Sequence, residues 1–368
     1  MNRINAIIMK IKHYPFLTLS AVVLSFNLIT SCISLDLDAI SGSTLVWNSG
    51  SNNYFNREAY TTLPGPNKLV IDGEVEEVTE IKLSRLPLRT VTVKEAVYCP
   101  SGDSIAFKGA FRYDGYALCD ILSSLKVDKA SKEDFWPPVD IYIEVRNDRG
   151  DLAVFSWGEI FYSANPYGIV IAKRVTRVIP GKTGELWELP DRTQLVVESD
   201  LISERNIKSP SQITIKSLKG NYIVNRDPVV LENDPCRLAL MSSLRDTLAL
   251  ITELPHELPL ISHTTLFYGN STGYKRVREF RGRQINRVLA PWFPSNEYRT
   301  IRSGMLSIAG VDGYRAAFSL AELINRNDHR DPLLVKEGNS FTLYAAGDAF
   351  ADRCIKGLSE IRLIDRED

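Results

Sequence analysis

An internal repeat constrains this chain more than any single motif does. The stretch DLISERNIKSPSQITI, residues 200–215, returns near the end of the chain as DAFADRCIKGLSEIRL, residues 348–363. At one constant spacing, the following residues recur: Asp200 as Asp348, Arg205 as Arg353, Ile207 as Ile355, Lys208 as Lys356, Ser211 as Ser359 and Ile213 as Ile361. Because charged and apolar residues both keep their places, we expect the two stretches to form the same local structure.

The repeat extends towards the N-terminus. Two further pairs match: AVFSWGEI (153–160) with AAFSLAEL (316–323), and FKGAFRYDGYALCDIL (107–122) with YKRVREFRGRQINRVL (274–289). The matched segments follow one another in the same order, and only the loops between them change in length. We therefore interpret the chain as a tandem duplication, with copy 1 over residues 67–217 and copy 2 over residues 228–364.

The N-terminal residues indicate a targeting sequence. Residues 1–31 begin with basic side chains and continue into the apolar stretch FLTLSAVVLSFNLIT, which is shorter than the roughly 20 residues of a membrane-spanning helix. The stretch ends at ITSC and resembles a bacterial lipoprotein signal, in which Cys32 is lipidated; an ordinary cleaved signal or a buried helix is the alternative. The sequence thus predicts an exported protein of the cell envelope, lipid-anchored to a bacterial membrane, with the polar residues 32–66 as a tether.

Composition sets wider limits on the partners and on the cysteine chemistry. With 44 basic and 45 acidic residues, the chain has no global field that favours nucleic acid, so we expect no nucleic-acid partner. The roughly 300 residues after the tether suffice for two domains of ordinary size. Besides the cysteine assigned to lipid, four remain: Cys99, Cys119, Cys236 and Cys354. We favour free, buried thiols, because the two copies share no cysteine position from which a common disulfide framework would follow.

The matched segments have the patterns of short helices set among strands. Leu118, Ile121, Leu122 and Leu125 follow helical spacing, and the second copy keeps this stripe. Each FS-x-x-E segment predicts a helix start with a capping box, formed by Ser156 with Glu159 in one copy and by Ser319 with Glu322 in the other. The intervening segments, such as VDIYIEV at 139–145, alternate as strands do. We therefore expect an α+β fold built from two tandem, mostly-β domains.

The order of these segments resembles a known family. LVIDGEVEEVTEIKLSRLPLRTVTVKEAVYCPSG, an aromatic-x-Gly-x-x-Leu helix, a strand leading to GVDGYRAAFSLAEL, and RNIKSPSQITI resemble the oxidoreductase molybdopterin-binding domain, the fold of sulfite oxidases. The resemblance spans nearly all of copy 1 and most of copy 2, which lacks the opening strand. It implies two tandem sulfite-oxidase-like domains, the second of them degenerate.

The resemblance also implies a set of candidate site residues. Active members of the family bind molybdenum through a cysteine thiolate, and the matching residue is Cys99, which copy 2 replaces by Leu266 or Phe267. A terminal lysine contacts the pterin phosphate in sulfite oxidases, and Lys208, with Arg205, matches that motif. Basic side chains suit such a role because charge-assisted hydrogen bonds hold phosphate. The alternative is that they are ordinary surface charges.

The sequence offers further basic residues but also departs from active members of the family, and this leads to two hypotheses for its function. Arg174, with Arg177 and Lys182, offers further basic residues, but copy 1 lacks the histidines of active members. The signal also lacks the twin arginine that usually exports folded molybdenum enzymes. The first hypothesis is therefore a cofactor-free binding or interaction module with an unknown protein or small-molecule partner. The second is a molybdopterin-dependent oxidoreductase that uses Cys99 as its molybdenum ligand.

Overall fold

The computed structural model describes residues 55–57, 59–99, 104–219, 222–225, 227–232, 236–269, 273–293 and 298–364. The expected signal, Cys32 and most of the expected tether therefore lie outside the described residues. The chain divides into two units, one of residues 1–60 with 180–183 and one of residues 61–179 with 184–368. Strand β1 (Phe55–Arg57) belongs to the first unit. The second unit contains both expected copies except residues 180–183.

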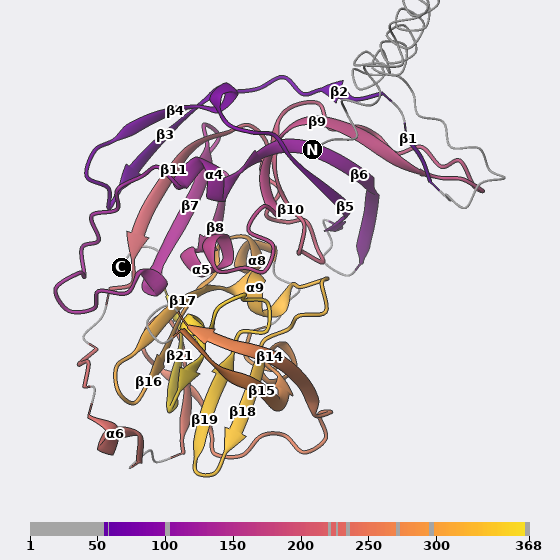
Figure 1. Cartoon of the computed structure of the whole chain (residues 1–368). Helices are drawn as coiled ribbons and strands as arrows, with labels where there is room; N and C mark the ends of the chain where they lie inside the picture. The colour runs from indigo at the N-terminus through magenta and orange to yellow at the C-terminus, as the bar shows by residue number, and fades with distance from the viewer. Residues whose placement is uncertain are drawn as a thin grey trace, which may run out of the picture. The chain divides into compact units, whose positions relative to one another are not determined.

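One sheet of the first half, here residues 61–219, has the strand order β4-β3-β11-β7-β8 (Figure 1). Its strands are β3 (Lys68–Gly73), β4 (Thr79–Lys82), β7 (Ile141–Asn147), β8 (Leu152–Ser156) and β11 (Pro210–Ser217). Strand β11 pairs parallel with β3 and antiparallel with β7, whereas β3–β4 and β7–β8 are antiparallel pairs. Buried Leu69 and Ile71 alternate with more exposed residues along β3, as expected for a sheet with one face on a core.

The remaining strands of the first half form a second, antiparallel layer. They are β2 (Thr61–Thr62), β5 (Arg89–Tyr98), β6 (Ile105–Ala117), β9 (Ile169–Pro180) and β10 (Gln194–Val197). Strand β6 lies between β5 and β9, and both β2 and β10 pair with β9. A Cβ on Gly115 would come within 2.5 Å of the Ile171 carbonyl oxygen on β9, so this close strand approach requires glycine there.

The second half, residues 222–364, also has two five-stranded sheets. One has the order β13-β12-β21-β16-β17 and the other the order β14-β15-β18-β19-β20. The strands of the first of these sheets are β12 (Leu238–Met241), β13 (Thr247–Ile251), β16 (Met305–Gly310), β17 (Arg315–Ser319) and β21 (Leu358–Ile364). Those of the other are β14 (Ile261–Gly269), β15 (Gly273–Gln284), β18 (Leu333–Glu337), β19 (Ser340–Tyr344) and β20 (Ile355–Lys356).

Strand order and strand direction agree between the halves. In the second half β21 pairs parallel with β12 and antiparallel with β16, just as β11 pairs with β3 and β7 in the first. The flanking strands β13 and β17 take the places of β4 and β8. The other sheet of the second half has the successive antiparallel pairs β14–β15, β15–β18 and β18–β19. These correspond to the antiparallel pairs β5–β6, β6–β9 and β9–β10 of the first half.

Short helices connect these strands at corresponding points. The α-helices are α4 (Leu118–Leu122), α5 (Trp157–Phe161), α6 (Pro228–Glu232), α7 (Ile285–Leu289), α8 (Tyr298–Ser303) and α9 (Leu320–Ile324), and the 3₁₀ helices are η2 (Leu83–Arg85), η3 (Pro138–Asp140) and η4 (Ala351–Arg353). The expected helix over 118–125 is shorter than its apolar stripe, since α4 ends at Leu122. The capping box is confirmed in full at Ser319. At Ser156 only one of its two hydrogen bonds forms, from the backbone N–H of Glu159 to the serine hydroxyl.

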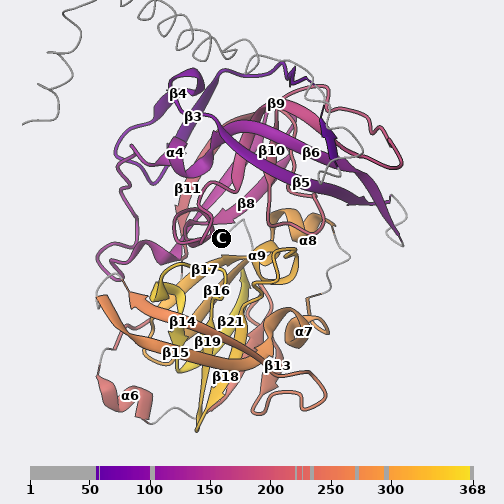
Figure 2. The same cartoon turned by 45° about the vertical axis from the view of Figure 1, so that its right-hand side comes forward.

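One hydrophobic core lies within the first half, whereas the core of the second half also includes Phe135 and Val139 of the first. A smaller cluster also joins the two halves. The shared cluster contains Tyr142 and Val154 of the first half and Met305 and Ala317 of the second. It lies where β8 and β17, the last strands of the two corresponding sheets, contact each other (Figures 1 and 2). Within the described part of the chain, no helix has the length and apolar character needed to cross a membrane.

Candidate functional site

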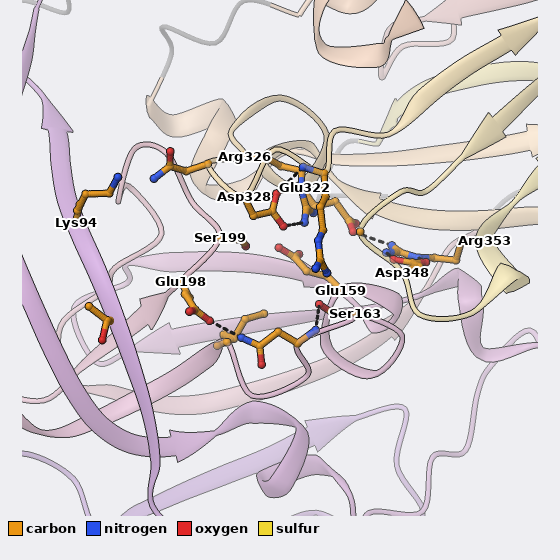
Figure 3. Close-up of a pocket in the computed structure, with 17 residues that line it drawn as sticks. Lys94, Glu159, Ser163, Glu198, Ser199, Glu322, Arg326, Asp328, Asp348 and Arg353 are labelled. Atoms are coloured by element: carbon orange, nitrogen blue, oxygen red, sulfur yellow. Dashed lines mark hydrogen bonds and ion pairs between the residues drawn. The ribbon is translucent and has the colours of Figure 1, made fainter. Parts of the chain in front are cut away.

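A polar cavity of about 390 Å³ opens between the two halves (Figure 3). The first half contributes Thr92, Lys94, Glu159, Ser163, Asn165, Gly168, Ile169, Glu198 and Ser199, and the second half contributes Glu322, Arg326, Asn327, Asp328, Arg330, Gly347, Asp348 and Arg353. We call it the central cavity. Its volume falls in the ~300–1,000 Å³ range of small-molecule sites, although its lining is more polar than is usual for them.

Beneath the central cavity lies a buried ion-pair network centred on Arg205. This side chain is fully buried, and its Nη2 donates to Asp200 and Glu159 at 2.6 Å each. Its Nε donates to Asp200 at 2.9 Å, while Nη1 donates to Glu159 at 3.0 Å and to the hydroxyl of Ser319 at 3.2 Å. The guanidinium lies 4.5 Å from the ring centroid of Phe155. Every nitrogen of this guanidinium is therefore engaged within the protein.

Arg353 forms the corresponding network in the second half. Its Nε and Nη2 donate to Asp348 at 2.8 and 2.7 Å, and its Nη1 donates to Glu322 at 2.8 Å. The same Nη1 donates to the hydroxyl of Ser156 at 2.9 Å. Each arginine thus bonds the N-cap serine of the other half, so the two networks hold the halves together reciprocally.

Backbone hydrogen bonds cross between the halves in the same reciprocal way. The N–H of Ala164 donates to the carbonyl of Gly347 at 2.9 Å, and the N–H of Asn327 donates to that of Ser199 at 2.8 Å. Isolated β-bridges pair Ser163 with Asp348 and Asp200 with Arg326. These main-chain contacts fix the segments that line the central cavity.

The network carries more carboxylates than arginines, and burial raises the pKa of two of these carboxylates. Burial raises the pKa of Glu322, with Glu159 adding to the rise and Arg353 opposing it. Burial also raises the pKa of Asp200, although Arg205 favours its ionised form. Two arginines face four carboxylates here, and a raised pKa favours retention of a proton among them.

One wall of the cavity is a charged segment of the second half. Arg326 donates through Nε to Asp328 at 2.9 Å, and a second hydrogen bond joins its Nη2 to the same carboxylate. Although burial opposes it, this pairing holds the pKa of Asp328 below its ordinary value. The Arg326 guanidinium lies against the backbone of Gly347. A Cβ at Gly347 would come within 2.7 Å of Arg326 Nη2, so a larger residue there would displace the arginine.

Three charged groups of the cavity retain bonding capacity. Neither the Lys94 ammonium nor the Arg330 guanidinium has a hydrogen-bond or ion-pair partner among the residues that the structure describes. Glu198 accepts a hydrogen bond from the side chain of Asn165 through Oε2 alone. Burial raises the pKa of Glu198, and the nearby Asp328 adds to the rise. These groups are available to a ligand.

The candidates predicted from the sequence are not gathered at one place. Arg205 is buried in the network, whereas Lys208, three residues on, is exposed and forms a 2.7 Å ion pair with Asp191. Arg174 is exposed on β9. Cys99 has a free, half-buried thiol and donates its N–H to the carbonyl of Ser104, across a segment, 100–103, that lies outside the described residues. Cys32 also lies outside the described residues.

The matching lysine of the second half has different surroundings. Lys356 lines a smaller cavity of about 230 Å³, together with Lys275, Asp352 and Cys354. Burial raises the pKa of the Cys354 thiol to about 12, which keeps it protonated and unreactive at neutral pH. Arg177 and Lys182, the other basic residues of the first half, do not line either cavity.

Sequence reasoning identified the residues of the network but not their association. The serine and glutamate of each FS-x-x-E segment were assigned to helix capping alone, and the repeated arginines to phosphate binding. The available signal was that Asp200 and Arg205 recur as Asp348 and Arg353, each pair five residues apart. The charged residues at 326–330 are not repeated at the matching positions 163–167, so the repeat gave no indication of this part of the cavity.

Comparisons with known proteins give a remote structural similarity. No family model matches the chain, and no curated protein matches it. Among solved structures, the chain is similar to the sulfane dehydrogenase SoxCD from Paracoccus pantotrophus, with 11% sequence identity and a TM-score of 0.28 over 81% of this chain and 77% of that chain. Within the described residues, no group of three or more His, Cys, Asp or Glu side chains is arranged to hold a metal ion.

Proposed function

We propose that this protein is an exported, lipid-anchored binding protein whose central cavity takes a small polar molecule. Its two halves are then tandem copies of one sulfite-oxidase-like domain that together form one site without a molybdenum cofactor. The observation that carries this proposal is the presence of unpaired cationic side chains, Lys94 and Arg330, in a cavity lined by both halves. Both residues are exposed, so a ligand of opposite charge can reach them from solvent and form charge-assisted hydrogen bonds.

The candidate cofactor residues, by contrast, do not fit a pterin phosphate. A phosphate ligand needs arginine N–H groups that point to an open site, but those of Arg205 are all directed to protein acceptors and the side chain has no solvent exposure. Lys208 is at the surface and is already paired with Asp191. Neither residue lines the central cavity, and neither does Cys99.

Two measurements on the mature protein test this proposal. Metal and pterin analysis after expression in a molybdenum-replete host should find no stoichiometric cofactor. A thermal-shift screen of small polar compounds should find one that raises the melting temperature of the wild-type protein, but not of a Lys94→Met, Arg330→Met variant. One molybdenum per chain that is lost on Cys99→Ser would instead support the oxidoreductase hypothesis.

The anchoring part of the proposal has its own test. If Cys32 carries the lipid, Cys32→Ala should release the protein from membranes and leave the unfolding transition of the body unchanged, because the tether separates the two. Continued membrane retention of the variant after a carbonate wash would contradict the lipid anchor. It would leave the binding proposal intact.

A further inference from the structure

We propose that the ligand of the central cavity is a small zwitterion with a carboxylate and a primary ammonium group, namely a free amino acid or a dipeptide. This inference rests on the proposed binding function and specifies its substrate class. It follows from separating the charges of the cavity into those that the protein already satisfies and those that it leaves open.

Most charges at the cavity are satisfied internally. Glu159 accepts hydrogen bonds from Arg205 and Ser319, and Glu322 accepts from Arg353 and from the backbone N–H of Ser319. These carboxylates are buried and hold the halves together. They therefore form the floor of the cavity and do not select a ligand.

The open cationic groups favour an anionic end on the ligand. Lys94 comes from β5 of the first half and Arg330 from the segment after α9 of the second, so the two belong to different halves. A carboxylate is the simplest anion that suits either group, because an ammonium and a guanidinium each form charge-assisted hydrogen bonds with it. Nearby Glu198 and Asp328 would repel a more highly charged anion such as a nucleotide phosphate chain.

The open carboxylate favours a cationic end. Glu198 is half-buried, and one of its two oxygens has no partner in the described part of the chain. An ammonium bound there would offset the burial that now raises the pKa of Glu198. Figure 3 shows Lys94 and Glu198 on the same side of the cavity, opposite the ion pair of Arg353 with Asp348.

Neutral polar groups complete the site. Ser199, Asn327 and Thr92 also line the cavity and offer hydroxyl and amide groups to a peptide bond. A neutral sugar would use these groups but would leave the Lys94 ammonium and the Arg330 guanidinium without a hydrogen-bonded anion. A zwitterion satisfies both sets at once, which is the complementarity expected of a specific polar site.

The test is a binding panel measured by calorimetry on the full mature protein. The probes are the standard L-amino acids and simple dipeptides such as Ala-Ala and Ala-Glu, each beside its N-acetyl and its C-amide derivative. Removal of either charge from the probe that binds should weaken binding roughly 10- to 100-fold, the usual effect of losing a hydrogen bond between charged groups. The free amino acids and the dipeptides distinguish the two possible ligand sizes.

Matched variants assign each end of the probe. Glu198→Gln should abolish the preference for the free amine over its N-acetyl form, and Lys94→Met should reduce the preference for the free carboxylate over the amide. Lys108→Met is the control, since Lys108 is an exposed lysine on the neighbouring strand β6 and does not line the cavity.

Two results would overturn the inference, and they are distinguishable. Binding of sugars or dicarboxylates in place of the zwitterions, or equal binding of the capped derivatives, would refute the ligand class and keep the binding function. If no small polar compound binds and the Lys94 and Glu198 variants behave like Lys108→Met, the binding function fails as well.

Discussion

The two halves agree in the residues that join them and differ in the residues that line the central cavity. Ser156, Glu159, Asp200 and Arg205 of the first half recur unchanged in the second as Ser319, Glu322, Asp348 and Arg353. Both arginines also lie over an aromatic ring, Arg205 over Phe155 at 4.5 Å and Arg353 over Phe318 at 4.3 Å. The same residue types therefore make reciprocal contacts in the two halves.

The cavity lining shows the opposite behaviour. The first half has Ser163 and Asn165 after α5, and the second half has Arg326 and Asp328 at the matching positions after α9. All four residues line the cavity. The first half also supplies Lys94 from β5, whereas no residue of the corresponding strand β14 lines the cavity. The ion-pair network is therefore symmetric between the halves, whereas the cavity lining is asymmetric. An asymmetric lining suits a ligand whose two ends differ.

The largest expected effect is from breaking the network. Arg205→Ala leaves Asp200 and Glu159 buried without their counter-charge, which should lower the free energy of unfolding by about 3–5 kcal/mol. Arg353→Ala should cost somewhat less. Glu159 commits both oxygens to Arg205, whereas Glu322 divides its oxygens between Arg353 and the helix cap.

Chemical denaturation measures both variants. The control is Arg149→Ala, an exposed arginine that should change stability by no more than about 0.5 kcal/mol. If the Arg205 and Arg353 variants behaved like this control, the network would not hold the halves together. An Arg205→Ala, Arg353→Ala double variant should depart from additivity, because the two networks share Ser156, Ser319 and their glutamates.

A smaller effect should follow from exchanging one residue that differs between the halves. Gly158 lies against Arg353, and a Cβ there would come within 2.2 Å of the arginine Nε, whereas the corresponding Ala321 of α9 already has a Cβ. Gly158→Ala should force Arg353 to shift and cost about 1–3 kcal/mol. Ala321→Gly should cost about 0.5–1 kcal/mol, the usual effect of glycine within a helix. Thermal or chemical unfolding compares the two, and equal costs would mean that Arg353 is not tightly held.

A third effect concerns pH. Because burial raises the pKa of Glu322 in the folded protein, the folded state binds more protons than the unfolded chain above the ordinary glutamate pKa of about 4.3. The free energy of unfolding should therefore fall as pH rises from that value towards neutrality, by up to about 1.4 kcal/mol per pH unit for one such group. Glu322→Gln should reduce this slope, and the exposed Glu185→Gln should leave it unchanged. A slope that Glu322→Gln does not alter would assign the proton to other buried carboxylates, such as Asp200.

The sequence revealed the local structure of these regions better than their association. The FS-x-x-E helix starts follow from short-range rules and were found where expected. The strand expected over 139–145 begins only at Ile141, after η3, and its residues are nearly all buried instead of alternating, so both of its faces are covered. That Arg205 would bond Ser319 follows from no local rule, because the two residues are far apart in the chain and meet only when the halves pack together. A basic residue next to a strand has the same sequence pattern whether it binds a ligand or a buried carboxylate.

The cavity was less accessible to sequence reasoning than the network. Lys94 belongs to an alternating strand in which every exposed position is polar, so nothing in the pattern distinguishes it from Thr90 or Thr92. Its significance depends on the segment at 326–330 of the other half, and only the packing of the two halves brings these segments to one cavity.

The smallest expected effect distinguishes Lys208 from Arg205, its buried neighbour in the repeated segment. Lys208 Nζ pairs with Asp191 at 2.7 Å, but the two side chains are 51% and 53% exposed. The hydrogen bond from Lys208 holds the pKa of Asp191 down to about 2, yet solvent and salt screen such a pair, so little folding energy is stored in it. We expect Lys208→Ala to leave the unfolding midpoint unchanged within error at physiological salt, with at most a slight decrease at low salt. A large loss of stability, or a loss of binding by the central cavity, would show that the terminal lysine has a role that its exposed position does not suggest. Lys356→Ala, the same change in the second half, is the matched comparison.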